Sequence, residues 1–229
     1  MCFSPTASFT LAGILAVGGG YCVRKALRDD RALLPLAIIP LAFAVQQFCE
    51  GWVWTGIHRG EPGLIKVASI SYLLFALLFW PVWVPFSTLL VERSRRTRRA
   101  LRAMTALGAV LGLALTIPIL VDPHWLAVEA HVRSVHYNIG DSPIFGVLPE
   151  WLWEALYVVV VATPLFVSSV RKLVHCGVAV IVSAMATYVF FDHALASVWC
   201  FFADVLSLYL VFLFASRPAV IRPLAPAMP

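Results

Sequence analysis

Two long apolar runs flank a short basic one: LIKVASISYLLFALLFWPVWVPFSTLLV (residues 64–91), ERSRRTRR (92–99) and ALRAMTALGAVLGLALTIPILV (100–121). Each apolar run is longer than the ~20 residues that a helix needs to cross the hydrocarbon core of a bilayer. Arginines between two such runs are what the positive-inside rule expects of a cytoplasmic loop. This stretch therefore predicts two transmembrane helices that are joined on the cytoplasmic side.

The composition of the whole chain excludes a soluble domain. Of the 229 residues, 61% are hydrophobic and only 13% are charged, whereas soluble domains carry roughly 25% charged residues. Seven helical crossings of about 20 residues each would use most of the chain. The five cysteines form no CxxC pair, so a disulfide framework is not expected. We therefore expect a single transmembrane domain over residues 1–229, with the lipid bilayer as its main partner.

Seven apolar segments follow one another along the chain, which predicts an all-α, polytopic membrane bundle of about seven transmembrane helices. The expected helices cover about 7–24, 32–57, 64–91, 100–121, 148–169, 173–191 and 194–215. The one long connection, residues 122–147, is expected on the outer face. Its Trp125, Leu126 and Val128 could belong to a short helix that lies in the membrane interface.

Basic residues alternate between the connections. They follow the first, third, fifth and seventh segments, as at Arg24, Lys172 and Arg217, while the intervening connections contain few. The positive-inside rule then predicts an N-terminus outside the cell and a C-terminus in the cytoplasm. The same placement explains the net charge of +5 without nucleic acid as a partner. We expect a multi-pass protein of a cell inner (plasma) membrane.

Polar residues interrupt the apolar segments in a pattern that suggests a site. In the last segment His193, Ser197, Cys200 and Asp204 follow one another at spacings of 4, 3 and 4, which places them on one face of a helix. Ionisable side chains are costly in lipid and normally face the interior of a bundle. We therefore expect this face to point toward the bundle centre.

Further polar residues fall at a similar depth in the other segments, all in the outer half of the membrane when depth is counted at 1.5 Å per residue. The predicted ligand-binding residues are Gln46, Gln47, Glu50, Trp54, Tyr72, Glu154, Trp199, Cys200 and Asp204. Three of these are carboxyls, which would repel one another at close range unless they share a cation. A divalent metal is therefore a candidate cofactor. Its predicted ligands are Glu50, Asp204, His193 and Cys2.

Three segments of the chain carry a family resemblance: MCFSPTASF (1–9), QQFCEGWVW (46–54) and SVWCFF (197–202). They resemble an uncharacterised bacterial family of small polytopic membrane proteins, whose members typically open MCFSATASF and carry a QQ-x-x-EG-x-x-W stretch. Pro5 stands here where the family has alanine. The resemblance extends over the chain and implies a protein of the bacterial inner membrane. It transfers no activity.

Two classes of function remain open. A retinal protein would need a lysine in the last segment, and this chain has none there. The seven-helix zinc amidohydrolases carry an H-x-x-x-H pair, but here Ser197 stands four residues after His193, so that set of metal ligands is incomplete. The first hypothesis is an outward-opening intramembrane polar site that binds a metal ion or a small polar ligand, with catalysis left open. The second is a non-enzymatic accessory subunit, whose polar residues only join helices to one another and to other membrane subunits.

Overall fold

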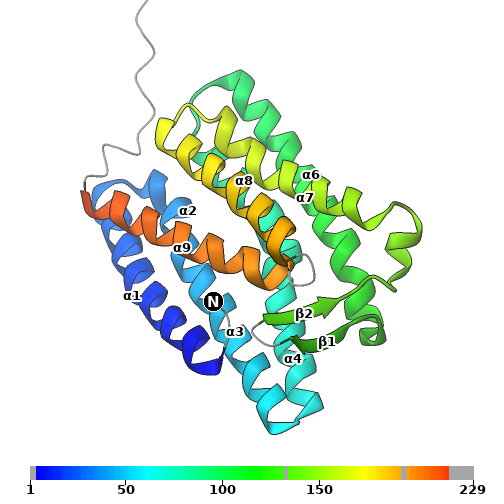
Figure 1. Cartoon of the computed structure of the whole chain (residues 1–229). Helices are drawn as coiled ribbons and strands as arrows, with labels where there is room; N and C mark the ends of the chain where they lie inside the picture. The colour runs from blue at the N-terminus through cyan, green and yellow to red at the C-terminus, as the bar shows by residue number, and fades with distance from the viewer. Residues whose placement is uncertain (1–3, 132–133, 192–194, 217–229) are drawn as a thin grey trace, which may run out of the picture.

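The computed structural model describes residues 4–131, 134–191 and 195–216. Within these ranges the chain forms seven long helical stretches and one β-hairpin (Figure 1). Six of the described stretches are long and apolar enough to cross a membrane, and the remaining one, Trp151–Val167, is a shorter apolar helix. The predicted membrane-type helical bundle is confirmed to this extent, and the hairpin is an addition to it.

The seven stretches follow the predicted segments, and two of them are broken into shorter elements. Their bounds are α1 Pro5–Asp29, then η1 Arg31–Leu33 with α2 Leu34–Ala37 and α3 Ile39–Arg59, then α4 Pro62–Leu73 with the π-helix Leu74–Phe79 and α5 Trp80–Val91, then α6 Arg95–Val121, α7 Glu150–Val167, α8 Arg171–Phe191 and α9 Leu195–Ser216. Prolines accompany both breaks. Pro40 is the second residue of α3 and Pro81 the second residue of α5, because proline has no N–H to continue the preceding helical ladder.

Several basic residues that were expected in loops belong to helices. Only residues 92–94 separate α5 from α6, and Arg95 opens α6. Ser94 caps this helix by accepting a hydrogen bond from the Thr97 N–H at 3.4 Å. In the same way α1 continues through Arg24 and Arg28. The first and fourth expected helices were too short because a helix satisfies its own backbone hydrogen bonds and need not end where the lipid ends.

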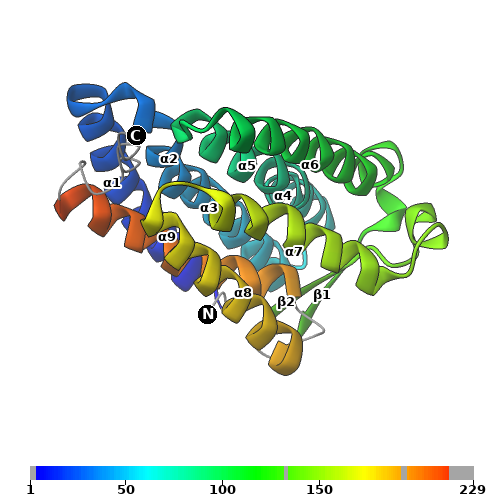
Figure 2. The same ribbon diagram turned by 90° about the horizontal axis from the view of Figure 1, so that it is seen from above.

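The helices form a closed ring. α1 packs on α3, α3 on α4, α5 on α6, α6 on α7, α7 on α8 and α8 on α9, and α9 returns to α1 (Figures 1 and 2). α3 also contacts α9, and α5 contacts α7. The α1–α3 contact is close because of Gly51, where a Cβ atom would lie 2.6 Å from the ring of Phe9.

One end of the bundle, which we call the arginine end, collects the basic connections. Buried residues from α1, α5, α8 and α9 meet there in one apolar cluster that includes Cys22, Val91, Leu173 and Phe214. Arg24 and Arg28 near the end of α1, the arginines from residue 93 onward and Arg171 at the start of α8 therefore lie at the same end of the molecule.

A buried carboxylate joins two connections at the arginine end. Glu92 is only 3% exposed and accepts hydrogen bonds from the backbone N–H groups of Arg93, Ser94 and Ser169, each at 2.8 Å, and from the Ser169 hydroxyl at 3.0 Å. The α5–α6 connection is thereby tied to the α7–α8 connection.

The opposite end, which we call the hairpin end, carries the β-hairpin. Strand β1, Ala127–His131, pairs antiparallel with β2, Ser134–Asn138, so the expected interfacial helix is wrong. In β2 the buried Val135 and Tyr137 flank the half-buried His136, which is the two-residue period of a strand. Tyr137 stacks on Tyr72 of α4 with ring centroids 4.9 Å apart. This contact anchors the hairpin to the bundle.

Candidate functional site

Six of the predicted site residues gather in the bundle interior and form what we call the polar core. They come from α3, α4 and α9. The polar core consists of Gln46, Gln47, Glu50, Tyr72, Cys200 and Asp204. The side chains of Glu50 and Asp204 are 0% exposed, so the expectation that both carboxyls point away from lipid is confirmed.

A chain of hydrogen bonds crosses the polar core. Trp80 of α5 donates from its indole N–H to the side-chain oxygen of Gln46 at 2.6 Å. The Gln46 amide nitrogen donates in turn to the Cys200 sulfur at 3.1 Å, and Tyr72 is a second hydrogen-bond partner of this thiol. Four helices are thereby connected. Sequence reasoning missed Trp80, because a tryptophan in an apolar run gives no sign of its polar partner.

The two buried carboxyls of the polar core lie close to each other. Asp204 is near enough to Glu50 for their charges to interact, and the Gln47 amide also lies near the Asp204 carboxyl, but neither oxygen of that carboxyl has a hydrogen-bond partner among the described residues. Ser207 donates to the backbone carbonyl of Asp204 at 2.7 Å. Two carboxylates in such a setting repel each other when both are ionised. The pair can therefore hold one positive charge, either as a proton or as part of a ligand.

The predicted metal centre receives no support from the described part of the chain. Within residues 4–131, 134–191 and 195–216, no three His, Cys, Asp or Glu side chains are grouped so that they could hold a metal ion. Glu50 and Asp204 form a pair and not a triad. The other two predicted ligands, Cys2 and His193, lie outside the described residues.

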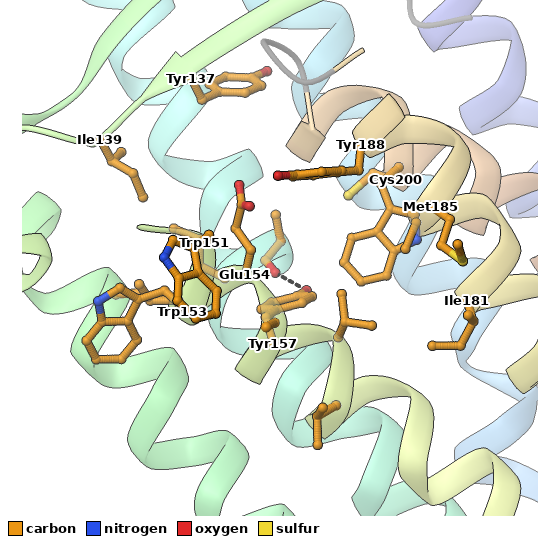
Figure 3. A pocket seen from close by; sticks show the side chains of 18 of the residues that line it. Tyr137, Ile139, Trp151, Trp153, Glu154, Tyr157, Ile181, Met185, Tyr188 and Cys200 are labelled. Carbon is orange, nitrogen blue, oxygen red and sulfur yellow. Dashed lines mark hydrogen bonds between the residues drawn. The ribbon is translucent and has the colours of Figure 1, made fainter. Parts of the chain in front are cut away.

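A cavity of about 600 Å³ lies beside the polar core at the hairpin end (Figure 3). Its volume is in the range of pockets that enclose small molecules. α7 and α8 form its walls, the hairpin borders it from the water-facing end, and α9 contributes the side next to the polar core. Its aromatic lining includes Tyr137, Phe145, Trp151, Trp153, Tyr157, Tyr188 and Trp199.

Glu154 supplies the carboxylate of this cavity. It extends from α7 toward the side on which Tyr137 and Tyr188 lie (Figure 3). Among the described lining residues it is the only Asp or Glu, and no Lys or Arg accompanies it; His136 of the hairpin is the remaining lining group with a basic side chain. A carboxylate among aromatic rings is an arrangement that attracts cations.

The cavity and the polar core are separate, and this corrects the expectation of one layer of three carboxyls. Of the polar core, all of whose residues are described, only Cys200 lines the cavity. Glu154 lies on the cavity side, while Glu50 and Asp204 lie behind it. Counting residues along a helix gives depth, but the direction in which each helix turns its side chains depends on packing, which depth does not reveal.

The remaining two predicted ligand-binding residues have different surroundings. Trp199 lines the cavity, where it donates to the Ser183 hydroxyl at 3.1 Å and meets the Tyr157 ring edge-on with centroids 5.4 Å apart. Trp54 is 5% exposed and packs in the apolar cluster around Tyr72 and Tyr137. It therefore supports the hairpin end without lining the cavity.

Tyr157 links the cavity to the π-helix. Its hydroxyl donates to the backbone carbonyl of Ala76, inside the stretch that departs from α-helical geometry. Single π-turns in helices are frequent at functional sites. α6 approaches the same region through Gly108 and Gly112, where a Cβ atom would meet the backbone of residues 77, 78 and 81. The G-x-x-x-G spacing, a known signal for close helix packing in membranes, could have revealed this contact.

The chain belongs to a family of unknown function (DUF6629), which matches residues 1–224. No curated protein and no solved structure matches it. The expected membership of an uncharacterised family is thereby confirmed, and the family carries no activity that could be assigned to the site.

Proposed function

We propose that this protein binds a small amphipathic cation inside the membrane, in the cavity at the hairpin end. The observation that carries the proposal is the position of Glu154 among aromatic side chains in a cavity of about 600 Å³. Aromatic faces attract cations through their quadrupoles, and hydrogen bonds between an ammonium and a carboxylate are among the strongest that proteins form. The apolar walls suit the uncharged part of such a ligand.

The polar core supports this site from behind. Cys200 belongs to both, and its thiol is held by Gln46, which Trp80 fixes in turn. A binding site keeps its geometry when packed and hydrogen-bonded neighbours hold the residues that touch the ligand. We therefore assign the hydrogen bonds of the polar core a positioning role, in which they fix α9 and with it the cavity wall formed by Trp199.

We further propose that the protein lies in the inner membrane of a bacterium, with the arginine end in the cytoplasm. The support is the gathering of basic residues from α1, α6 and α8 at that end, which the positive-inside rule assigns to the cytoplasmic side. The cavity then lies in the outer half of the membrane, close to the hairpin. The resemblance of MCFSPTASF and QQFCEGWVW to a bacterial family supports the proposed bacterial origin.

Calorimetric titration of the purified protein in nanodiscs of zwitterionic lipid tests the proposal. The probe is phenethyltrimethylammonium, and phenethyl alcohol is its uncharged counterpart. We expect saturable binding of the cation, weakened about tenfold by Glu154→Gln because the attraction between the quaternary ammonium and the carboxylate is lost. Asp141→Asn is the matched control, because Asp141 is exposed and does not line the cavity. Equal binding of the two probes, or an unchanged affinity in Glu154→Gln, would contradict the proposal.

A further inference from the structure

We propose that the natural occupant of the cavity is a single-chain amphiphile with a cationic head, and that it enters sideways from the membrane between α7 and α8. This inference rests on the proposed function above. It adds the class of ligand and the route by which the ligand arrives.

The cavity reaches the lipid-facing surface of the bundle. Five of its lining residues are large side chains on α7 and α8 that are between 51% and 69% exposed. These residues are Trp151, Val159, Met185, Tyr188 and Val189. Exposed apolar side chains on helices of this kind face hydrocarbon, because lipid is the surrounding solvent along the span. The side of the cavity between the two helices therefore borders on lipid.

The lipid-exposed residues that line the cavity lie on the parts of α7 and α8 toward the hairpin end. Nearer the arginine end the two helices touch, since a Cβ atom on Gly177 would lie 3.1 Å from side-chain atoms of Leu165 and of Phe166. Toward the hairpin end, Val158 of α7 and Ile181 of α8 both line the cavity. The contact at Gly177 therefore bounds the lipid-exposed side of the cavity at one end, while a smaller cavity of about 100 Å³ continues inside the bundle between α7, α8 and α9. Such an elongated space suits a single hydrocarbon chain lying along the helices.

The hairpin covers the end of the cavity that points away from the membrane. His136, Tyr137 and Ile139 line the cavity from this side. Val135 is fully buried, and Tyr137 is stacked on Tyr72, so β2 is held against the bundle. The structure thus offers a lipid-bordered side and a covered water-facing end, which favours a ligand that is already dissolved in the bilayer.

The position of Glu154 selects the head group. Its carboxyl extends toward the hairpin side of the cavity (Figure 3), while Val159 and Met185 border the cavity on the lipid side. A ligand that places an ammonium beside Glu154 would leave its chain against these apolar residues. An anionic head would meet the carboxylate of Glu154 instead and be repelled.

Photolabelling of the full-length protein in phosphatidylcholine nanodiscs tests this inference. The probes are dodecyltrimethylammonium and dodecyl sulfate, each with the same diazirine in the chain. Labelled peptides are identified by mass spectrometry. We expect the ammonium probe to label residues 151–159 and 181–189 in a manner that excess unlabelled dodecyltrimethylammonium suppresses. Glu154→Gln should weaken this labelling about tenfold, because the attraction between the quaternary ammonium and the carboxylate is lost, and dodecyl sulfate should give only labelling that is not suppressed.

A second variant tests the route. Ala155→Trp places a bulky side chain on the exposed part of α7 that lines the cavity, and Val178→Trp, on α8 away from the cavity, is its control. We expect Ala155→Trp to lose the suppressible labelling while it still binds phenethyltrimethylammonium, which also reports that the variant is folded. Suppressible labelling that persists in Ala155→Trp at the native level would overturn the sideways route.

The two proposals can fail separately. Binding of phenethyltrimethylammonium without suppressible labelling of 151–159 or 181–189 would overturn the amphiphile and leave the proposed function intact. Equal suppressible labelling by dodecyl sulfate would overturn the cationic head. If neither ammonium probe binds, both proposals are overturned.

Discussion

Trp80 donates a 2.6 Å hydrogen bond to the side-chain oxygen of Gln46. The amide nitrogen of the same glutamine donates a hydrogen bond to the sulfur of Cys200, so one side chain joins α3, α5 and α9 in the interior. Lipid tails are as apolar as leucine, so helices in a membrane gain little from hiding apolar surface and depend on close packing and on interhelical hydrogen bonds. Gln46 is thus a structural centre of the bundle as well as a neighbour of the cavity.

Replacement of Gln46 by leucine should destabilise the bundle. Gln46→Leu leaves the buried Trp80 N–H without its acceptor, and we expect a loss of about 1–2 kcal/mol in the free energy of unfolding. Thermal unfolding of the purified protein measures it. Val45→Leu, at the neighbouring lipid-facing position, should leave stability unchanged. In the double variant with Trp80→Phe, the losses should be less than additive, because both changes remove the same bond; full additivity would contradict the contact.

Stability at acid pH should depend on Glu92. Burial acts to raise the pKa of this carboxyl, but the hydrogen bonds from Ser169, Ser94 and Arg93 outweigh burial and hold its pKa below the ordinary value of 4.5. A carboxyl whose pKa is lowered by folding stabilises the protein above its unfolded pKa, and this contribution is lost as the pH falls through the folded pKa.

Glu92→Gln is the variant that isolates this effect. At neutral pH it should lower the free energy of unfolding by about 2 kcal/mol, since hydrogen bonds to a charged acceptor are lost. The difference from the native chain should be constant at neutral pH and should shrink below about pH 4.5. Melting temperatures of both proteins across that range provide the measurement. A difference that stays the same at all pH values would show that the Glu92 charge has no part in the stabilisation.

The buried carboxyl pair should tolerate loss of one charge better than loss of its polar groups. Glu50→Gln keeps the size and most hydrogen-bonding capacity of the side chain and removes a repulsion from Asp204, so we expect stability within about 1 kcal/mol of the native chain. Glu50→Leu removes the polar group and should cost about 2 kcal/mol, because its partners are left unsatisfied. Thermal unfolding and bound-metal content should be measured on the same preparations. Equal losses in the two variants, or a stoichiometric metal that Glu50→Gln abolishes, would contradict this account.

Reporter fusions should reveal the orientation. Fusions after Arg31, Arg99 and Lys172 should report the cytoplasm, because the arginine end is basic. Fusions near Gly60 and Asp141, at the hairpin end, should report the outside. If positions 60 and 99 report the same side, the orientation and the number of crossings are both wrong.

Much of the fold could be predicted because membrane crossing imposes a length and a polarity on each segment. The hairpin could not be predicted in this way. Residues 127–138 combine a few apolar residues with polar ones, and so short a pattern fits an interfacial helix about as well as two strands. What decides for strands is Tyr137, whose ring stacks on Tyr72, a partner far away in the chain.

The candidate site was predicted in part, because the sequence indicates the depth of a residue in a helix but not the direction in which the helix turns it. Depth along the helices placed Glu50, Cys200 and Asp204 together, and α3 and α9 do meet there. Glu154 has a similar depth but belongs to the cavity, because helix rotation is set by packing. The structural role of Glu92 could not be predicted from the sequence, because its partner Ser169 is 77 residues away.

The π-helix has a consequence for which changes of length the chain can accept. A π-turn contains one residue more than an α-helical turn, so deletion of a single residue within Leu74–Phe79 would restore regular geometry and leave the orientation of α5 nearly unchanged. A deletion within the regular helix α4 would instead rotate α5 by about 100° against the part of α4 before the deletion. After the deletion in α4, Trp80 would turn away from Gln46, and Glu92 away from Ser169. An insertion or deletion in the connection between β2 and α7, residues 139–149, would be absorbed by a surface loop instead. Homologous chains should therefore differ in length at the hairpin end or, by one residue, at the π-helix, and keep the lengths of α4 and α5 fixed.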